Sequence, residues 1–304
     1  MTVNPCKSET SLRYPSRLGK CVPPSVRLDP VVWGAATPGP LDRQQVDQFD
    51  RDGFLVVEGW IPFDEVVEWR REAERMRADP RQELVYEKGS QLVRTIFKVD
   101  RNTSYFARIA RDGRLLGLAE QLLGGPVYVH QSRINFKSAL KGGDFWWHSD
   151  FEIWHTEDGM PAMRALSVSV LLDASTQLNG PMLFIPGSHR TFVPCTGSTP
   201  DMNYKQELQT QDYTAPDNEP LADLIRSRGI VPATGEPGTL VVSDCNTMHG
   251  SAANMSPWPR SILFYCYNSI HNTLPERPPL GTPPRPDFLA HRDYAPLSIE
   301  DGDR

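Results

Sequence analysis

The chain has 304 residues, of which 39% are hydrophobic and 23% charged, so it is long enough for one large globular domain or two small ones. Its formal charge is -6 and it has no concentrated basic stretch, which excludes nucleic acid as a partner. It has no apolar run long enough to span a bilayer and no signal-peptide core, which excludes a membrane partner. With 5 cysteines and no CxxC motif, we expect reduced thiols in a cytoplasmic protein.

The first third of the chain predicts an irregular arm followed by helices. Residues 1–40 are polar and rich in proline, so we expect an extended N-terminal arm. A single domain is expected over residues 41–294, and a C-terminal tail over 295–304. Apolar spacing and capping residues predict helices over Leu41–Asp50, Asp64–Arg77 with Asp64 as its cap, and Arg111–Leu123, with a strand over Phe54–Gly59.

From Pro126 onward, short apolar segments alternate with turn residues. They predict strands over Val127–Lys137, Arg164–Leu172, Pro181–Ile185, Gly238–Ser243 and Arg260–Asn268. A polar insertion at about 196–229, with a helix over Leu221–Arg228, interrupts the series. Early helices before many short strands predict a mainly β protein with flanking helices and a jelly-roll, cupin-like core.

One stretch, Asp144–His155, carries the strongest chemical signal. In an extended strand, His148 and Asp150 project to the same face while Ser149 points away. An imidazole and a carboxylate can supply two ligands of the facial triad that holds non-haem Fe(II). His249 is the best candidate for the third ligand.

Other interpretations of this stretch stay open at this point. An HxD tripeptide is short and occurs by chance, and His130, His155 and His189 are further possible ligands, although none has a carboxylate two positions away. The chain has no HExxH, GxSxG or P-loop motif. A zinc hydrolase or a non-catalytic metal-binding jelly roll is therefore an alternative to an oxygenase.

Arg260 favours the oxygenase, because a guanidinium can hold the far carboxylate of a dicarboxylic acid through two parallel hydrogen bonds. It follows His249 at a spacing that one hairpin closes. In the strand before the HxD stretch, one face is polar and the other is not strongly apolar, which favours a polar lining inside a ligand-holding barrel over a solvated sheet face. That polar face consists of Gln131, Arg133, Asn135 and Lys137. Among the nearby aromatic residues, Trp154 and Phe264 are the ones that we assign to a substrate pocket.

With these residues in place, the chain resembles the phytanoyl-CoA-dioxygenase-like superfamily of Fe(II)/2-oxoglutarate oxygenases, and within it the ectoine hydroxylases. The superfamily pattern is His148-x-Asp150, His249 and Arg260, and the more specific blocks are Trp147–Glu152, Trp154–Pro161 and Asp244–Ser251. The resemblance runs from about Tyr14 to Asp293. It implies a double-stranded β-helix enzyme that binds Fe(II), uses 2-oxoglutarate and O2 as co-substrates, converts ectoine to 5-hydroxyectoine and forms a homodimer.

The resemblance also implies a role for each matching residue. His148, Asp150 and His249 would bind iron, and the 2-oxoglutarate contacts would be Phe145, Asn135, Ser251 and Arg260, with Lys137 a weaker candidate. Gln131, Arg133, Trp154 and Phe264 would contact ectoine. Two departures from the family pattern, Ile153 in place of threonine and Ser138–Leu140 in place of a Pro-Gly turn, leave room for another small substrate such as proline.

Overall fold

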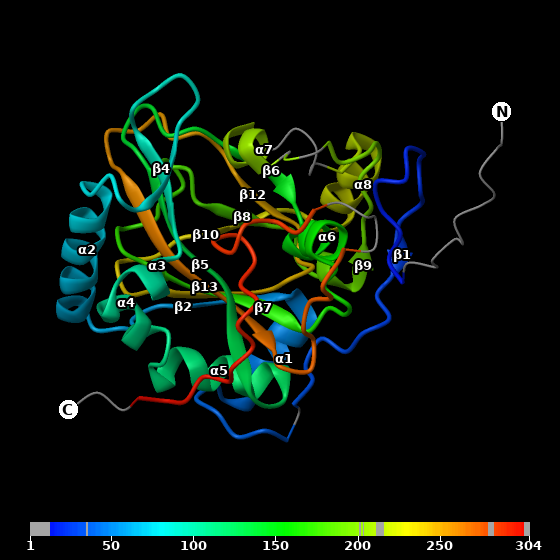
Figure 1. Ribbon diagram of the computed structural model, residues 1–304, viewed down its shortest axis with the longest axis horizontal. Coiled ribbons are helices and arrows are strands. Elements are labelled where there is room, and N and C mark those ends of the chain that lie inside the picture. The colour runs from blue at the N-terminus through cyan, green and yellow to red at the C-terminus, as the bar shows by residue number, and fades with distance from the viewer. Residues whose placement is uncertain are drawn as a thin grey trace.

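The computed structural model describes residues 13–34, 36–200, 202, 204–210, 216–278 and 283–300. Parts of the predicted arm, insertion and tail, and Cys6, lie outside the described residues. Within this part of the chain, two antiparallel β-sheets form the centre and helices flank them (Figure 1). The expectation of β-sheets with flanking helices is confirmed, and the sheets are antiparallel.

The larger sheet has 7 strands in the order β2-β11-β7-β13-β5-β4-β3. Its strands are β2 (Phe54–Val57), β11 (Leu240–Asp244), β7 (Ala165–Leu171), β13 (Arg260–Ser269), β5 (Val127–Lys137), β4 (Val93–Phe97) and β3 (Glu83–Tyr86). The central strands β7, β11 and β13 are buried along their whole length, as expected for strands with a neighbour on each side. The predicted bounds of β5 agree with the structure, and the other predicted strands differ by one or two residues at an end.

The smaller sheet has 4 strands in the order β10-β8-β12-β6. Its strands are β10 (Val231–Ala233), β8 (Met182–Phe184), β12 (His249–Ser251) and β6 (Phe145–His148). A cavity is lined by residues of β4, β5 and β13 on one side and of β6, β8 and β12 on the other. The two sheets therefore enclose it between them.

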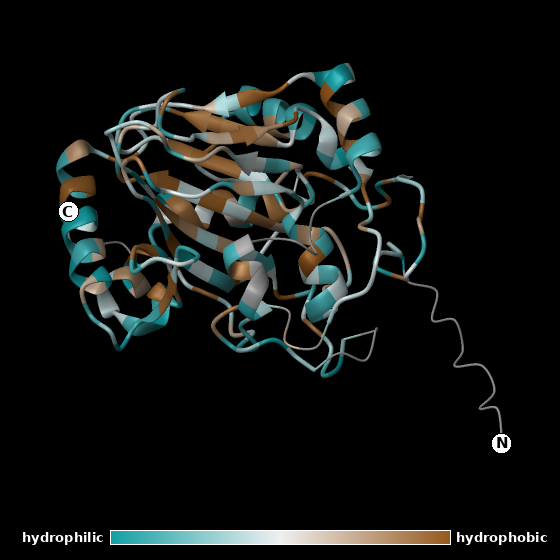
Figure 2. Ribbon diagram, turned by 90° about the horizontal axis from the view of Figure 1, so that it is seen from above, coloured by the Kyte–Doolittle hydropathy of each residue, from teal (hydrophilic) through white to brown (hydrophobic). Residues whose placement is uncertain are grey.

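Helices cover the outer face of the larger sheet. They are α1 (Arg43–Asp52), α2 (Phe63–Arg77), α3 (Val99–Asn102), α4 (Ser104–Ile109) and α5 (Gly113–Leu123). Phe49, Trp69 and Leu116 from these helices pack with Val168 and Leu263 of the sheet in one buried core. In Figure 2 the apolar strands accordingly lie inside, while the helices keep hydrophilic residues on their outer faces. None of the described helices is long and apolar enough to cross a membrane.

Capping residues set the limits of these helices. The side chains of Asp42 and Asp112 accept hydrogen bonds from the backbone amides of Gln45 and Arg114, at the first turns of α1 and α5. The prediction that Asp64 caps α2 is wrong. Pro62 occupies the cap position without a side-chain hydrogen bond, and Asp64 lies within the first turn, where its charge favours the helix dipole.

Strand β5 contains an irregularity that the sequence pattern did not reveal. In its pairing with β13, Gln131 faces Cys266 but Val129 faces Tyr267, so His130 is an extra residue in a bulge. The bulge reverses the alternation, and Val127 and Val129 share a buried core with Ile134. The regular two-faced alternation expected along Val127–Lys137 therefore holds only after the bulge.

The described part of the N-terminal arm lies against the core. It contains one short strand, β1 (Ser25–Val26), which pairs with β9 (Thr191–Phe192). Arg17 and Arg27 are buried in this arm, at 4% and 8% exposure. The predicted insertion holds helices α7 (Tyr204–Thr210) and α8 (Asn218–Arg228).

Candidate active site

Three side chains from the smaller sheet and its flanking turn converge in the wall of the cavity. The ligand atoms of His148, Asp150 and His249 all lie within 4.8 Å of one another. Nε2 of His148 is 3.9 Å from Oδ1 of Asp150, and the two imidazole centroids are 4.3 Å apart. Two imidazoles and one carboxylate grouped at a cavity wall are a donor set suited to non-haem Fe(II).

Hydrogen bonds orient both imidazoles for metal binding. Nδ1 of His148 contacts the carbonyl oxygen of Trp146 at 2.6 Å, and Nδ1 of His249 contacts that of Thr247 at 2.9 Å. Because a carbonyl can only accept, each Nδ1 carries the proton and each Nε2 presents a lone pair. Burial, reinforced by His249, lowers the pKa of His148 to about 3, which keeps this imidazole neutral.

Asp150 supplies the negative charge of the group. Burial raises the pKa of this carboxyl, but His249 and Arg133 together outweigh it, so that the pKa is lowered and the group stays ionised. Ser167 donates a hydrogen bond of 3.2 Å to Oδ2. A carboxylate and two neutral imidazoles leave a bound divalent cation with one net positive charge for an anionic co-substrate.

The backbone brings His148 and Asp150 together in a different way from the one predicted. Strand β6 ends at His148, and Asp150 is the first residue of α6 (Asp150–Ile153). Ser149 caps this helix by accepting a hydrogen bond of 3.3 Å from the Glu152 amide. The shared position of the two side chains results from a strand-to-helix junction, and the prediction of one continuous strand is corrected.

The end of the cavity beyond the metal group is cationic. Arg260 begins β13 opposite Lys137 of β5 and lines the cavity at 3% exposure. Burial lowers its pKa to about 10, only partly offset by Asp173, so it remains charged at neutral pH. No ion pair engages Arg260 among the residues that the structure describes. It is therefore a buried cation available to a carboxylate.

The other predicted residues at this end differ in how they face the cavity. Phe145, Asn135 and Ser251 line it. Lys137 is absent from its wall, and its Nζ donates to Ser251 Oγ at 2.7 Å and to a backbone carbonyl at 2.6 Å. Burial, together with Arg260 and Arg94, lowers the pKa of Lys137 to about 6. Lys137 thus supports Ser251 from behind the wall.

The four predicted substrate contacts, Gln131, Arg133, Trp154 and Phe264, line the same cavity as the metal group. The Arg133 guanidinium stacks over Phe264 at 4.5 Å and donates to the Gln131 side-chain oxygen. The Gln131 amide donates to the Leu289 carbonyl at 2.8 Å. Both the oxygen and the nitrogen of the Gln131 side-chain amide therefore form hydrogen bonds within the protein. These bonds orient Arg133 and the C-terminal segment around the cavity.

Sequence reasoning missed two charged residues that line this cavity and a third, Arg94, that packs against its wall residue Phe145. Arg94 stacks on Phe145 at 3.6 Å and pairs with Glu87 at 3.0 Å. At the substrate end, Glu157 and Arg285 line the wall. The Glu-Asp pair that follows Trp154 was a local signal, because acidic residues beside a pocket aromatic can hold a cation. Nothing local connected Arg94 or Arg285 with the site.

The alternative histidines lie outside the metal group. His155 Nδ1 contacts the Met160 carbonyl at 2.7 Å, and His189 Nε2 contacts the Asp50 carbonyl at 3.0 Å. His130 lies 3.5 Å from Asp158, with its ring against Trp154 at 4.8 Å. Within the described residues, His148, Asp150 and His249 are the only such group of three or more metal-ligating side chains.

Two antiparallel sheets around a buried site of two histidines and one carboxylate define the class of mononuclear non-haem metal oxygenases. Comparison with known families narrows this class. The model of the phytanoyl-CoA dioxygenase (PhyH) family matches residues 49–262, and the chain belongs to this family.

Individual relatives are similar over almost the whole chain. The ectoine dioxygenase of Sphingopyxis alaskensis is 47% identical over 295 residues, which cover 95% of this chain and 96% of that protein. The crystal structure of EctD from S. alaskensis with 2-oxoglutarate and 5-hydroxyectoine has a TM-score of 0.85 at 43% identity, covering 95% of this chain and 98% of that one. The structure of the same protein with bound Fe has a TM-score of 0.84 and covers 96% and 99%.

Proposed function

We propose that this protein is an Fe(II)- and 2-oxoglutarate-dependent ectoine hydroxylase with a double-stranded β-helix core. The observation that carries the proposal is the convergence of His148, Asp150 and His249 with an unpaired buried Arg260 in one cavity. The 47% identity to an ectoine dioxygenase supplies the substrate. The reaction consumes ectoine, 2-oxoglutarate and O2, and releases 5-hydroxyectoine, succinate and CO2.

The donor set fits a resident Fe(II), which His148, Asp150 and His249 would hold. When bound, iron supplies the oxygen activation that couples decarboxylation of 2-oxoglutarate to hydroxylation of a C–H bond. Arg260 would hold the far carboxylate of 2-oxoglutarate, and Asn135, Phe145 and Ser251 line the space between Arg260 and the metal ligands. The contribution of these side chains is orientation of the co-substrate.

The opposite side of the cavity suits a small zwitterionic ring. Arg133 provides a cation for the ectoine carboxylate, and Trp154 and Phe264 provide aromatic faces for the ring and its delocalised cation. Trp154 is 2% exposed and Phe264 5% exposed, so this part of the cavity excludes most water. Arg133 already covers one face of Phe264, so we assign the larger ring contact to Trp154.

Ile153 is the departure from the family pattern that touches the cavity. An isoleucine lacks the hydroxyl of the usual threonine and cannot offer a hydrogen bond to the substrate. This favours weaker polar recognition of ectoine beside Trp154, and it is the observation that keeps another small amino acid such as proline as a second candidate substrate. The reaction class is the same for both.

Product analysis tests the proposal. The protein is incubated with Fe(II), 2-oxoglutarate and air, with either ectoine or proline, and both hydroxylated product and succinate are measured. We expect hydroxyectoine and succinate in equal amounts, with ectoine turned over at least about tenfold more efficiently than proline, a difference of about 1.4 kcal/mol. More hydroxyproline than hydroxyectoine would reject ectoine as the substrate, and no succinate under any condition would reject the oxygenase.

The proposal also covers the domain organisation, the cellular location and the oligomeric state. We propose one oxygenase domain over residues 41–294, with an arm before it and a tail after it. The four described cysteines are free thiols, which supports a cytoplasmic location. The homodimer implied by the sequence resemblance remains a proposal, and light scattering of the purified protein tests it.

A further inference from the structure

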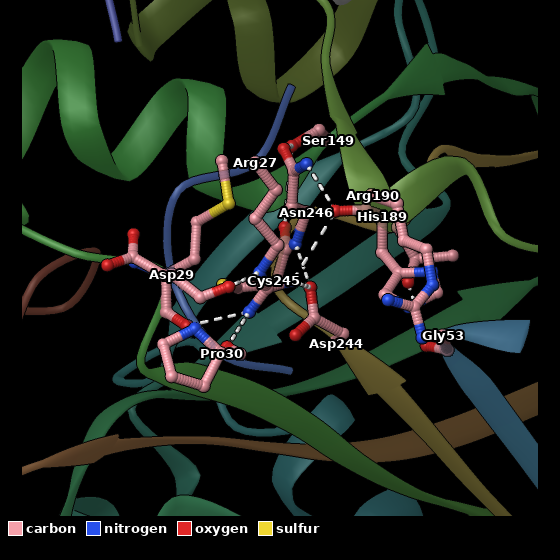
Figure 3. A network of polar contacts seen from close by, with 12 residues as sticks. Arg27, Asp29, Pro30, Gly53, Ser149, His189, Arg190, Asp244, Cys245 and Asn246 are labelled. Carbon is pink, nitrogen blue, oxygen red and sulfur yellow. Dashed lines mark hydrogen bonds and ion pairs between the residues drawn. The ribbon is translucent and has the colours of Figure 1, made fainter. Parts of the chain in front are cut away.

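Arg27 of the N-terminal arm is a buried arginine that uses every donor of its side chain. Its guanidinium pairs with Asp244 at 2.8 Å through Nη1, which also contacts the His189 carbonyl at 3.4 Å. Nη2 donates to the carbonyls of Pro30 at 2.7 Å and Met163 at 2.9 Å, and Nε donates to that of Asp29 at 2.9 Å. Three of these five contacts tie the arm to distant parts of the chain at Asp244, His189 and Met163, and the other two fix the arm's own backbone (Figure 3).

The partner of Arg27 opens the turn that connects β11 to β12. Asp244 Oδ1 accepts hydrogen bonds from both Arg27 and the Asn246 backbone amide, each 2.8 Å long. The Asn246 side-chain amide donates to the carbonyls of His189 at 2.9 Å and Thr191 at 3.1 Å. Asp244 is 4% exposed and Asn246 1% exposed, so water cannot replace these contacts.

The same turn touches the chain beside each of the three metal ligands. Asn246 Oδ1 accepts a hydrogen bond of 3.1 Å from the hydroxyl of Ser149, the residue between His148 and Asp150. The Cys245 carbonyl accepts a hydrogen bond of 2.7 Å from the backbone amide of Phe151, the residue that follows Asp150. The Thr247 carbonyl fixes the His249 ring through Nδ1 at 2.9 Å. Ser149, Asp244, Cys245 and Asn246 appear together with Arg27 in Figure 3.

We propose that Arg27 is a positioning residue of the metal centre, which acts through the turn 244–247 to hold His148, Asp150 and His249 in one geometry. The proposal rests on the metal site of the proposed function and deepens it. The N-terminal arm, which contributes no ligand, thereby becomes part of the machinery that sets metal affinity. Removal of outer partners of metal ligands costs about 10- to 100-fold in affinity in other proteins, and we expect a loss in this range.

Metal titration of the whole protein tests the inference without relying on turnover. Co(II) binding, followed by its visible absorption, is measured for the parent protein and for Arg27→Met, at a temperature well below the unfolding midpoint of each. We expect Arg27→Met to bind Co(II) about 10- to 100-fold more weakly and to show a changed absorption spectrum. Arg27→Lys keeps the charge but cannot reach the surrounding carbonyls together, so we expect an intermediate loss.

A matched control lies on the same arm. Arg13 pairs with Asp29 at 2.8 Å, but its side chain is 45% exposed, and it reaches the turn only indirectly, through Asp29 and Arg27. Arg13→Met should keep the parent Co(II) affinity within about twofold, whereas an effect equal to that of Arg27→Met would mean that any loosening of the arm weakens the site and would overturn the specific role of Arg27.

Two further variants keep the test decisive if Arg27→Met does not fold. Ser149→Ala and Asn246→Ala each remove one contact between the turn and the ligand segment, and each should weaken Co(II) binding. With a foldable Arg27→Met, the double variant with Asn246→Ala should lose less affinity than the sum of the single losses, because both act on one turn. Parent-like affinity in Arg27→Met, or in both Ser149→Ala and Asn246→Ala, overturns the inference. Failure of the parent protein to bind Co(II) in a manner that His249→Ala abolishes would instead reject the metal site itself.

Discussion

Replacement of Arg260 by methionine tests the co-substrate end of the cavity most directly. The guanidinium is 3% exposed, and the described residues provide no ion pair for it. Such a cation is costly to bury until an anion arrives. Loss of a charge-assisted contact to a buried partner costs about 2–5 kcal/mol, which corresponds to roughly 30- to 4,000-fold in affinity for 2-oxoglutarate.

Two measurements separate an anchor for 2-oxoglutarate from a structural residue. Calorimetric titration of the metal-loaded protein gives the affinity for 2-oxoglutarate, and thermal unfolding of the metal-free protein gives the stability. A buried cation without a counter-ion destabilises the unliganded protein. We therefore expect Arg260→Met to lose affinity for 2-oxoglutarate without a fall in unfolding temperature. A structural residue would show the reverse.

Lys137→Met is the natural comparison, because Lys137 faces Arg260 across the strand pair but lies behind the cavity wall. We expect it to weaken 2-oxoglutarate binding less than Arg260→Met does. Unchanged affinity in Arg260→Met, together with a large loss in Lys137→Met, would refute the assignment of Arg260 and identify Lys137 as the anchor.

The remaining expectations concern the metal, the substrate and pH. His249→Ala should abolish both turnover and retention of iron, since a facial triad has no spare ligand, and an active variant with full iron content would contradict the site. Trp154→Ala should raise the KM for ectoine at least about tenfold with iron content unchanged, whereas parallel loss of both would indicate a structural role. Ile153→Thr should lower the KM for ectoine by restoring a hydroxyl, and an increased KM would count against that reasoning. The pKa of Lys137 is lowered from 10.5 to about 6 in the folded protein. Between these two pH values the Lys137 side chain is protonated in the unfolded chain but not in the folded protein, so its contribution makes the free energy of unfolding rise with pH. Urea unfolding of the metal-free protein at both ends of this pH range should show this rise, and Lys137→Met should reduce it.

Local sequence determined the chemical identity of the site. Imidazole and carboxylate groups at positions 148, 150 and 249, and a guanidinium at 260, are properties of the residues themselves, and alternation of side chains gave the bounds of β5 correctly. The alternation of side chains depends only on the backbone geometry of neighbouring residues, so a short segment of sequence is enough to show it. These local signals were sufficient to select the three side chains that the structure brings within 4.8 Å of one another.

Tertiary structure decided how these residues meet and what supports them. The helix that starts at Asp150 depends on the Ser149 cap, and the bulge at His130 depends on the register of β5 against β13, so alternation alone could not locate either. Arg27 reaches Asp244 across 217 residues. An ion pair between residues so far apart produces no periodic pattern in the sequence, because it forms only when the folded chain buries both charges in the same place.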